Sequence, residues 1–156
     1  TCALPIFIAV MQKWAAAYVP SDISPVPGFA KWLEREGVNR SAQGDDELRL
    51  AAARYITSAR DKRGAVSDAV ARFHLGNGAR LEAVHSQADL SAKGMAQAHG
   101  VMVNYLYDLD QIEANHVRLF EMGEVMTSAA VQELLHPAKP KPKGKLPRLL
   151  QRKDAA

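Results

Sequence analysis

The 156-residue sequence is poor in cysteine and has no hydrophobic run long enough to cross a membrane. Its one cysteine, Cys2, excludes an internal disulfide framework and a cysteine-based zinc cluster. The apolar stretch at residues 3–10 is soon followed by Gln12 and Lys13, whereas a membrane-spanning helix needs about 20 apolar residues. The composition therefore predicts no membrane partner, and it suits a reducing compartment such as the cytoplasm.

Net positive charge is also absent outside the C-terminal end. Seven of the 20 Lys and Arg residues lie in residues 137–156, together with one of the 17 acidic residues, Asp154. Residues 1–136 thus carry 13 basic and 16 acidic residues, which argues against nucleic-acid binding by the whole molecule. The end of the chain also holds four prolines and few apolar residues, so residues 137–156 are predicted to be a disordered basic tail.

The remaining length is enough for one domain with a sizeable core. Residues 1–21 form an apolar head in which Ala15–Ala17 resembles a signal-peptide cleavage site, but no basic residues precede the apolar run. A buried strand or helix of a domain whose beginning is missing explains the head better than a signal peptide does.

Hydrophobic periodicity between these ends predicts an α+β fold, mostly helical, with two or three strands in one sheet. Pro20, Pro25 and Pro27 predict an extended connector over residues 19–28. Strands are predicted at residues 79–85 and 101–107, joined by a polar crossover, and the second is expected to be buried on both faces. Three helices are predicted before the first of these strands: from Phe29 to a stop at Gly37, from a cap at Asp45 or Asp46 to Ala59, and from Ser67 or Asp68 through His74. Two more are predicted after the second strand: from a cap at Asp108 to Gly123, and from Thr127 or Ser128 to Leu135. In the helix that begins at Asp108, we expect Leu109, Ile112 and Phe120 on one apolar face.

The strongest chemical signal lies in residues 69–107. His74 ends a helical phrase and faces a Gly-Asn-Gly turn, where an imidazole can act as a general acid or base, or can simply bond a backbone carbonyl. Tyr107 closes the second strand and is either a core tyrosine with a satisfied hydroxyl or a donor in a site. Asn77 suits a turn with positive φ, and Asn104 suits a buried amide that fixes strand position.

The sequence predicts no metal site. Glu113 and His116 have the spacing of one carboxylate-bridged di-iron ligand pair, but such sites need two copies and further glutamates. His85 and His99 are not spaced as metal ligands either.

Four motifs resemble the C-terminal part of malonyl-CoA decarboxylase, in the family's order. They are Ser24-Pro25-Val26-Pro27-Gly28-Phe29, then ARFHLGNGARLE at residues 71–82, the AD-S--G spacing at residues 88–94, and GVMVNYLYDLDQIEANH at residues 100–116. The resemblance covers roughly Ser24 to Leu135. It implies that residues 22–136 are the C-terminal half of a catalytic domain with a partial GNAT-like acyl-CoA fold, preceded by a head that is truncated or foreign to the family.

The resemblance also implies an activity, a carboxy-lyase that converts malonyl-CoA to acetyl-CoA and CO2 without a cofactor. The family's catalytic residues fall on Ser24, His74 and Tyr107, with Asn77 and Asn104 in supporting places. Malonyl-CoA is then the small-molecule partner, and a homo-oligomer is compatible with the family. No glycine-containing CoA-binding loop precedes Ser24, so whether the fragment is active alone is left open.

A different class of function also stays open. The chain could be a non-catalytic remnant, or an interaction module that uses the seven cations of the tail to hold an acidic partner. The tail contains no aromatic residue on which a base could stack, and a tail that only aids solubility explains it equally well.

Overall fold

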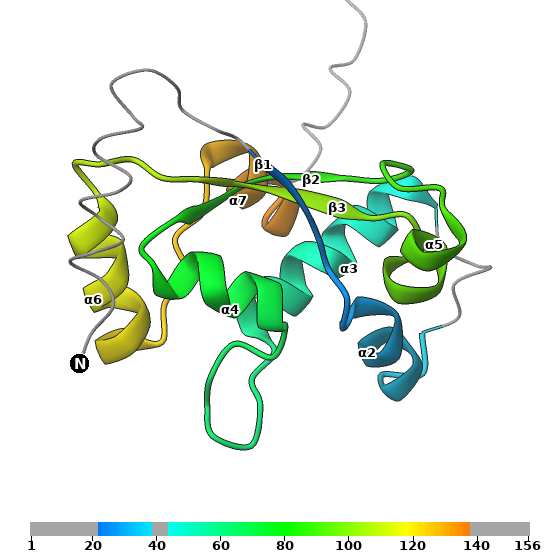
Figure 1. Cartoon of the computed structure of the whole chain (residues 1–156), viewed down its shortest axis with the longest axis horizontal. Coiled ribbons are helices and arrows are strands. Elements are labelled where there is room, and N and C mark those ends of the chain that lie inside the picture. Colours follow the sequence, from blue (N-terminus) through cyan, green and yellow to red (C-terminus); the bar gives the residue numbers. More distant parts are fainter. Residues whose placement is uncertain (1–21, 39–43, 138–156) are drawn as a thin grey trace, which may run out of the picture.

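The computed structural model describes residues 22–38 and 44–137, which form one sheet and six helices (Figure 1). The predicted head and tail therefore lie outside the described residues, apart from Pro137. The elements in chain order are β1 (Asp22–Pro25), α2 (Phe29–Arg35), α3 (Asp45–Ser58), α4 (Ala69–Gly76), β2 (Arg80–His85), α5 (Ala92–Ala98), β3 (Met102–Leu106), α6 (Ile112–Met122) and α7 (Ala129–Leu135).

The three strands form an antiparallel sheet in the order β1-β3-β2, which confirms the predicted mixed fold with a single small sheet. The predicted extended connector is wrong at residues 22–25, because these pair with β3 as a strand despite Pro25. A proline is tolerated there because β1 has one described neighbour, β3, and an edge strand can lack a ladder donor. The predicted crossover is also corrected: α5 joins two antiparallel neighbours, so the chain returns along the same sheet.

Register decides which side chains share a face. Ser24 lies opposite Val103, and Leu81 lies opposite Tyr105, so all four belong to one face of the sheet. A bulge between Leu81 and Ala83 lets β2 bury both Leu81 and Val84, which a strict alternation would place on opposite faces. In Figure 1 the sheet runs along the top of the view, with α2, α3 and α4 below it.

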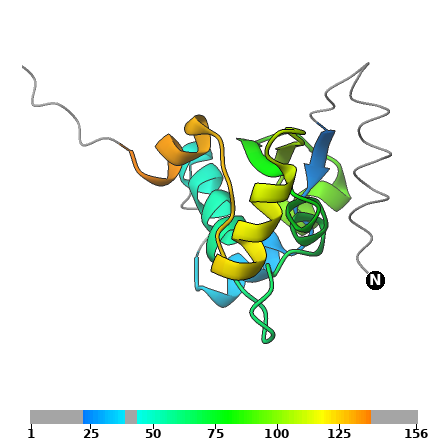
Figure 2. The ribbon, with the colours of Figure 1, turned by 90° about the vertical axis from the view of Figure 1, so that its left-hand side faces the viewer.

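Helix α3 contributes an apolar stripe to the core. On α3 the buried residues include Leu48, Ala52, Tyr55 and Ile56, which recur at helical spacing. An aromatic cluster of Phe29, Trp32 and Tyr55 joins α2 to α3. α7 packs against α3 and β2, and Figure 2 shows orange α7 beside cyan α3.

Helix starts differ from the predicted ones in two places. Asp68 and Ser128 do cap α4 and α7 with their side chains. The N-cap of α3 is instead Gly44, with Asp45 and Asp46 in the first turn, where carboxylates still favour the helix dipole. α6 begins after Gln111 rather than Asp108, because residues 108–111 form a turn first. The predicted apolar face of α6 is wrong for Phe120, which is 67% exposed, and for Leu109.

Candidate active site

Helix α4 delivers His74 to the sheet, and its two ends are both fixed by side chains. At the start, Asp68 Oδ1 accepts hydrogen bonds from the backbone N–H groups of Val70 and Ala71 at 3.0 Å. At the end, the Asn77 amide donates to the Phe73 carbonyl at 2.8 Å. Gly78 then takes φ of 84°, and a Cβ there would meet the Ile112 carbonyl, so only glycine fits this turn. The helix therefore ends two residues after His74, and a turn of three residues leads into β2.

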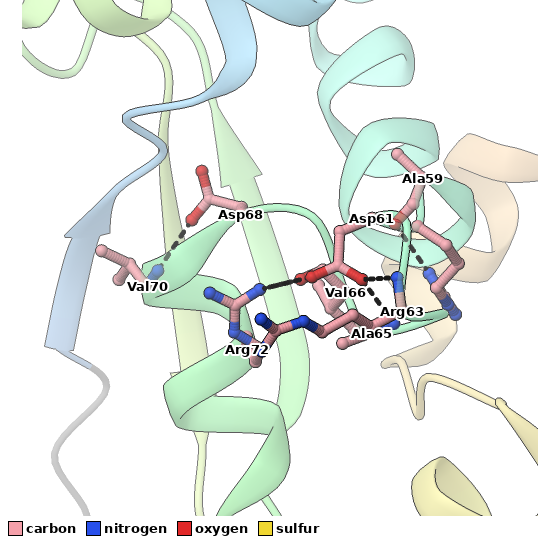
Figure 3. A network of polar contacts seen from close by, with 9 residues as sticks. Ala59, Asp61, Arg63, Ala65, Val66, Asp68, Val70 and Arg72 are labelled. Atoms are coloured by element: carbon pink, nitrogen blue, oxygen red, sulfur yellow. Dashed lines mark hydrogen bonds and ion pairs between the residues drawn. The ribbon is translucent and has the colours of Figure 1, made fainter.

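The loop that leads into α4 is held by its own polar network (Figure 3). The Asp61 carboxylate accepts from the N–H groups of Arg63 at 2.8 Å and Ala65 at 3.0 Å, and these bonds hold its pKa below the usual range. Arg72 on α4 donates to the Val66 carbonyl at 3.0 Å and pairs with Asp61 at 3.3 Å. The first turns of α4 are thereby tied to the loop that precedes them.

The half-buried imidazole of His74 lies between a phenol and an alcohol. Its Nδ1 is 2.8 Å from the Tyr107 hydroxyl, and its Nε2 is 3.4 Å from Ser24 Oγ. These three groups come from α4, from the residue following β3, and from β1. The three side chains on which the family's catalytic residues fall therefore lie together, while their chemical roles stay predictions.

One face of the His74 ring is covered by an aromatic neighbour. The Tyr105 ring stacks on the imidazole with centroids 4.5 Å apart and an interplanar angle of 10°. Phe73 approaches at 5.3 Å in a T-shaped arrangement. The imidazole is therefore contacted on a face as well as at both nitrogens.

Ser24 reaches the site because β1 is a strand. It is 6% exposed and lies opposite Val103 in the middle of the β1–β3 ladder. The turn after it is anchored by the N–H of Gly28, which donates to Asp68 Oδ2 at 3.0 Å. A Cβ on Gly28 would collide with the Tyr55 hydroxyl, which gives the Pro-Gly-Phe motif a packing reason. Asp68, 1% exposed, thus connects the serine-bearing turn to the histidine-bearing helix.

The side chains of the two asparagines make structural contacts. Asn77 ends α4 with φ of −91°, so the predicted positive φ is wrong and belongs to Gly78 instead. Asn104 has its Oδ1 2.5 Å from Nε2 of His85. Because Asn104 precedes Tyr105 in β3, it lies on the opposite face of the sheet from the stacked ring.

Burial changes the acidity of two tyrosines behind the site. Desolvation, followed by the nearby Asp68 charge, raises the pKa of Tyr55 to about 12. Desolvation also raises the pKa of Tyr105 well above its ordinary value. Among the residues that the structure describes, the Tyr105 hydroxyl is the one buried side-chain polar group without a hydrogen-bond partner. Both phenols are therefore neutral over the physiological pH range.

His116 is explained by packing. Its Nδ1 donates to the Gly76 carbonyl at 2.8 Å, and its ring lies 4.4 Å from that of Phe120. Over residues 22–38 and 44–137, no group of three or more His, Cys, Asp or Glu side chains is arranged to hold a metal ion.

Two residues of the site were not singled out from the sequence as site residues. The sequence pattern places Tyr105 in an apolar strand and Asp68 at a helix start, and neither pattern indicates a site. The alternation of β3 does place Tyr105 and Tyr107 on the same side of the strand, so a signal for Tyr105 existed. The contact between Asp68 and Gly28, 40 residues apart, has no such local signal.

Comparisons with known proteins point to one family. The family model for the malonyl-CoA decarboxylase C-terminal domain matches residues 39–145. A curated relative, mitochondrial malonyl-CoA decarboxylase of Mus musculus, is 30% identical over 105 residues, which are 67% of this chain and 21% of that protein. The Rattus norvegicus relative of the same name has the same identity and coverage.

Solved structures agree with this result. The crystal structure of malonyl-CoA decarboxylase from Agrobacterium vitis has a TM-score of 0.74 and 34% identity, over 86% of this chain and 41% of that one. The enzyme from Rhodopseudomonas palustris has a TM-score of 0.63 and 41% identity, over 71% of this chain and 34% of that one. The chain thus spans about a fifth of the mouse and rat relatives and less than half of these solved chains. None of the described helices is long and apolar enough to span a membrane.

Proposed function

The chain belongs to the malonyl-CoA decarboxylase family, and we propose that its Ser24–His74–Tyr107 group decarboxylates malonyl-CoA to acetyl-CoA and CO2. The observation that carries the proposal is the position of His74, whose two ring nitrogens face Tyr107 and Ser24. This histidine lies in the Phe-His-Leu motif on which the family resemblance also rests. Because the chain spans only part of its relatives, the activity is proposed for the site and is not carried over from them.

The proposed reaction has two chemical steps, loss of CO2 and protonation of the α-carbon. The bond between the malonyl carboxylate and the α-carbon breaks, CO2 leaves, and the electron pair moves into the thioester to form an enolate. Fixed hydrogen-bond donors stabilise the developing negative charge on the thioester oxygen. A proton is then delivered to the α-carbon, which gives acetyl-CoA. The thioester itself accepts the electrons, so the proposal includes no organic cofactor.

The geometry favours His74 as the centre of proton movement. A phenol is a stronger acid than an alcohol, so the Tyr107 hydroxyl is a better donor to Nδ1 than the Ser24 hydroxyl is to Nε2. The histidine proton then lies on Nε2, directed toward Ser24 and the space beside it. The 3.4 Å separation from Ser24 is long for a hydrogen bond, and such contacts often shorten when substrate binds. In this arrangement Ser24 and the protonated Nε2 supply the donors, and Tyr107 holds the histidine tautomer.

Other parts of the proposal rest on the family likeness alone. We include a GNAT-type fold for the complete catalytic domain, a place in fatty acid or malonate metabolism, a homo-oligomer, and a cytoplasmic location. The likeness to bacterial enzymes of known structure supports the cytoplasmic location. The mouse and rat relatives are named as mitochondrial proteins, so the location is the part most open to test.

Replacement of His74 by alanine tests the proposed function. Release of labelled CO2 from malonyl-CoA should fall by about 10²- to 10⁴-fold, the usual contribution of a positioned acid or base. The matched control is His136→Ala, because His136 is exposed at the end of α7. A His74→Ala protein that turns over at the parent rate, or a parent chain that neither binds nor decarboxylates malonyl-CoA, would contradict the proposal.

A further inference from the structure

The ring of Tyr105 restrains His74 in a way that the two hydrogen bonds cannot. Contacts at Nδ1 and Nε2 lie in the plane of the imidazole, so the ring can still tilt about the line that joins its two partners. The χ2 torsion of histidine is broad and roughly two-fold, so this tilt costs little energy. A parallel ring at 4.5 Å and 10° removes it, because any tilt would push imidazole atoms into the phenol.

Tyr105 is itself held firmly enough to serve as a reference plane. It is 1% exposed and lies in β3, the central strand of the sheet. Its backbone is paired on both sides, opposite Asp22 of β1 and Leu81 of β2. His74, by contrast, is half-buried and belongs to a helix of eight residues. Of the two stacked rings, the tyrosine is the one whose position is set by the sheet.

We propose that Tyr105 is a positioning residue for His74, and that its buried ring fixes the imidazole plane so that Nδ1 meets Tyr107 and Nε2 meets Ser24. The inference deepens the proposed function and rests on it, since the aim of the imidazole matters because of the proton that it moves. Tyr105 touches no reacting atom in this scheme and acts through His74. Misplacement of a reacting group by a fraction of an ångström to 1 Å can cost up to about 100-fold in rate.

The ring, rather than the hydroxyl, does this positioning. The hydroxyl has no hydrogen-bond partner among the described residues, whereas the ring makes the stacking contact. Phenylalanine would keep the flat ring and remove the hydroxyl. Leucine and methionine would remove the flat ring, and methionine fills irregular core space well enough to keep the variant folded where leucine fails.

Nitrogen NMR of the histidine rings tests the proposal without substrate. The chain labelled with ¹⁵N-histidine is measured as the parent and as Tyr105→Phe, Tyr105→Leu and Tyr105→Met, with His74 assigned by the loss of its signals in His74→Ala. We expect the parent and Tyr105→Phe to show one protonated and one unprotonated ring nitrogen, as a single tautomer does. In the leucine and methionine variants the two nitrogen signals should move toward a common average. Ile56→Ala, a core truncation in α3, should leave the His74 signals as in the parent.

The activity of the same proteins gives a second measurement. In the leucine and methionine variants kcat should fall roughly 10- to 100-fold with KM unchanged, and Tyr105→Phe should restore the parent value. Unchanged His74 signals in both the leucine and the methionine variant would overturn the proposal, because Tyr105 would then only fill the core. A shift in Tyr105→Phe equal to that in the other variants would also overturn it, because the hydroxyl would then be responsible. If His74→Ala is silent in decarboxylation, the proposed function falls, whereas the ring signals still decide the positioning.

Discussion

Tyr55, which lies behind the site, makes contacts that favour its neutral form. The Tyr55 phenol lies against the buried Asp68 carboxylate, and it hydrogen-bonds to that carboxylate. A phenol can donate to a carboxylate, but a phenolate beside a carboxylate is repelled. Burial and the neighbouring charge therefore both favour the neutral tyrosine, which explains a pKa of about 12.

Alkaline pH should therefore unfold the protein through Tyr55. The folded-state pKa of this acid lies above its ordinary value of 10.0, so its contribution to stability is complete below pH 10 and is lost as the pH rises toward 12. Urea unfolding measured from pH 8 to 12 should show this loss. Tyr55→Phe should be less stable near neutral pH, by about 1 kcal/mol for the lost hydrogen bond, but should depend less on pH between 10 and 12. An equal pH dependence in both proteins would assign the effect to another group, such as Tyr105.

The residues around His74 also show what could and could not be predicted from the sequence. The family motifs alone predict that Ser24, His74 and Tyr107 belong to one site, because each residue lies in a short distinctive motif. The stack of Tyr105 on His74 could not be predicted, since it depends on where α4 crosses the sheet. The turn after His74 contains both an asparagine and a glycine that suit positive φ, and Gly78 takes it instead of the predicted Asn77 because glycine tolerates that conformation better.

At the scale of elements, α4 and β1 form one unit held by Asp68. One carboxylate oxygen accepts from the first turn of α4, and the other accepts from Gly28 just after β1. Ser24 and His74 are carried by these two elements. Asp68 therefore helps to set the distance between Ser24 and His74 through the backbone groups that it holds.

Removal of the Asp68 carboxylate should destabilise the protein and separate the two elements. Asp68→Ala loses the cap of α4 and leaves buried N–H groups without acceptors, so we expect a loss of about 3 kcal/mol in the free energy of unfolding. Asp68→Asn keeps one carbonyl oxygen for the cap and should lose less.

Urea unfolding measures both values, with Asp46→Ala as the control. Asp46 also lies in the first turn of a helix, but its side chain is 88% exposed, so its loss should cost less than about 0.5 kcal/mol. An Asp68→Ala protein as stable as Asp46→Ala would show that the buried cap contributes nothing.

Helical elements were the easiest to predict and β1 the hardest. The apolar stripe of α3 is contained in fourteen successive residues, so its periodicity alone defines the buried face. β1 contains four residues and a proline, and its pairing with β3 depends on residues far along the chain. Local propensity favours an extended connector there, and the ladder with β3 makes it a strand.

At the scale of the whole molecule, one hydrophobic core joins the three-stranded sheet to the helices that alternate with its strands along the chain. The cluster runs from Val26, just after β1, to Val131 in α7, and between them it includes buried residues of α2, α3, α4, β2, α5 and β3. Of the predicted site residues, Ser24 lies two positions before this span, and the others, His74, Asn77, Asn104 and Tyr107, lie within it. The family match extends further, to residue 145, into the stretch predicted as a basic tail.

Deletion of residues 138–156 separates the enzyme interpretation from the interaction-module interpretation. The described core ends at α7, so the deletion should leave the thermal unfolding temperature and the rate of CO2 release within error of the full chain. A second truncation after residue 145 keeps the whole family match and serves as the matched control. If only the shorter protein loses activity, residues 138–145 belong to the catalytic domain and the predicted boundary at 137 is wrong. If both truncations abolish function while His74→Ala is silent, the chain works through its tail, including the cations Arg148, Arg152 and Lys153 that both truncations remove, and not through its histidine. The salt dependence of partner binding should then be steep.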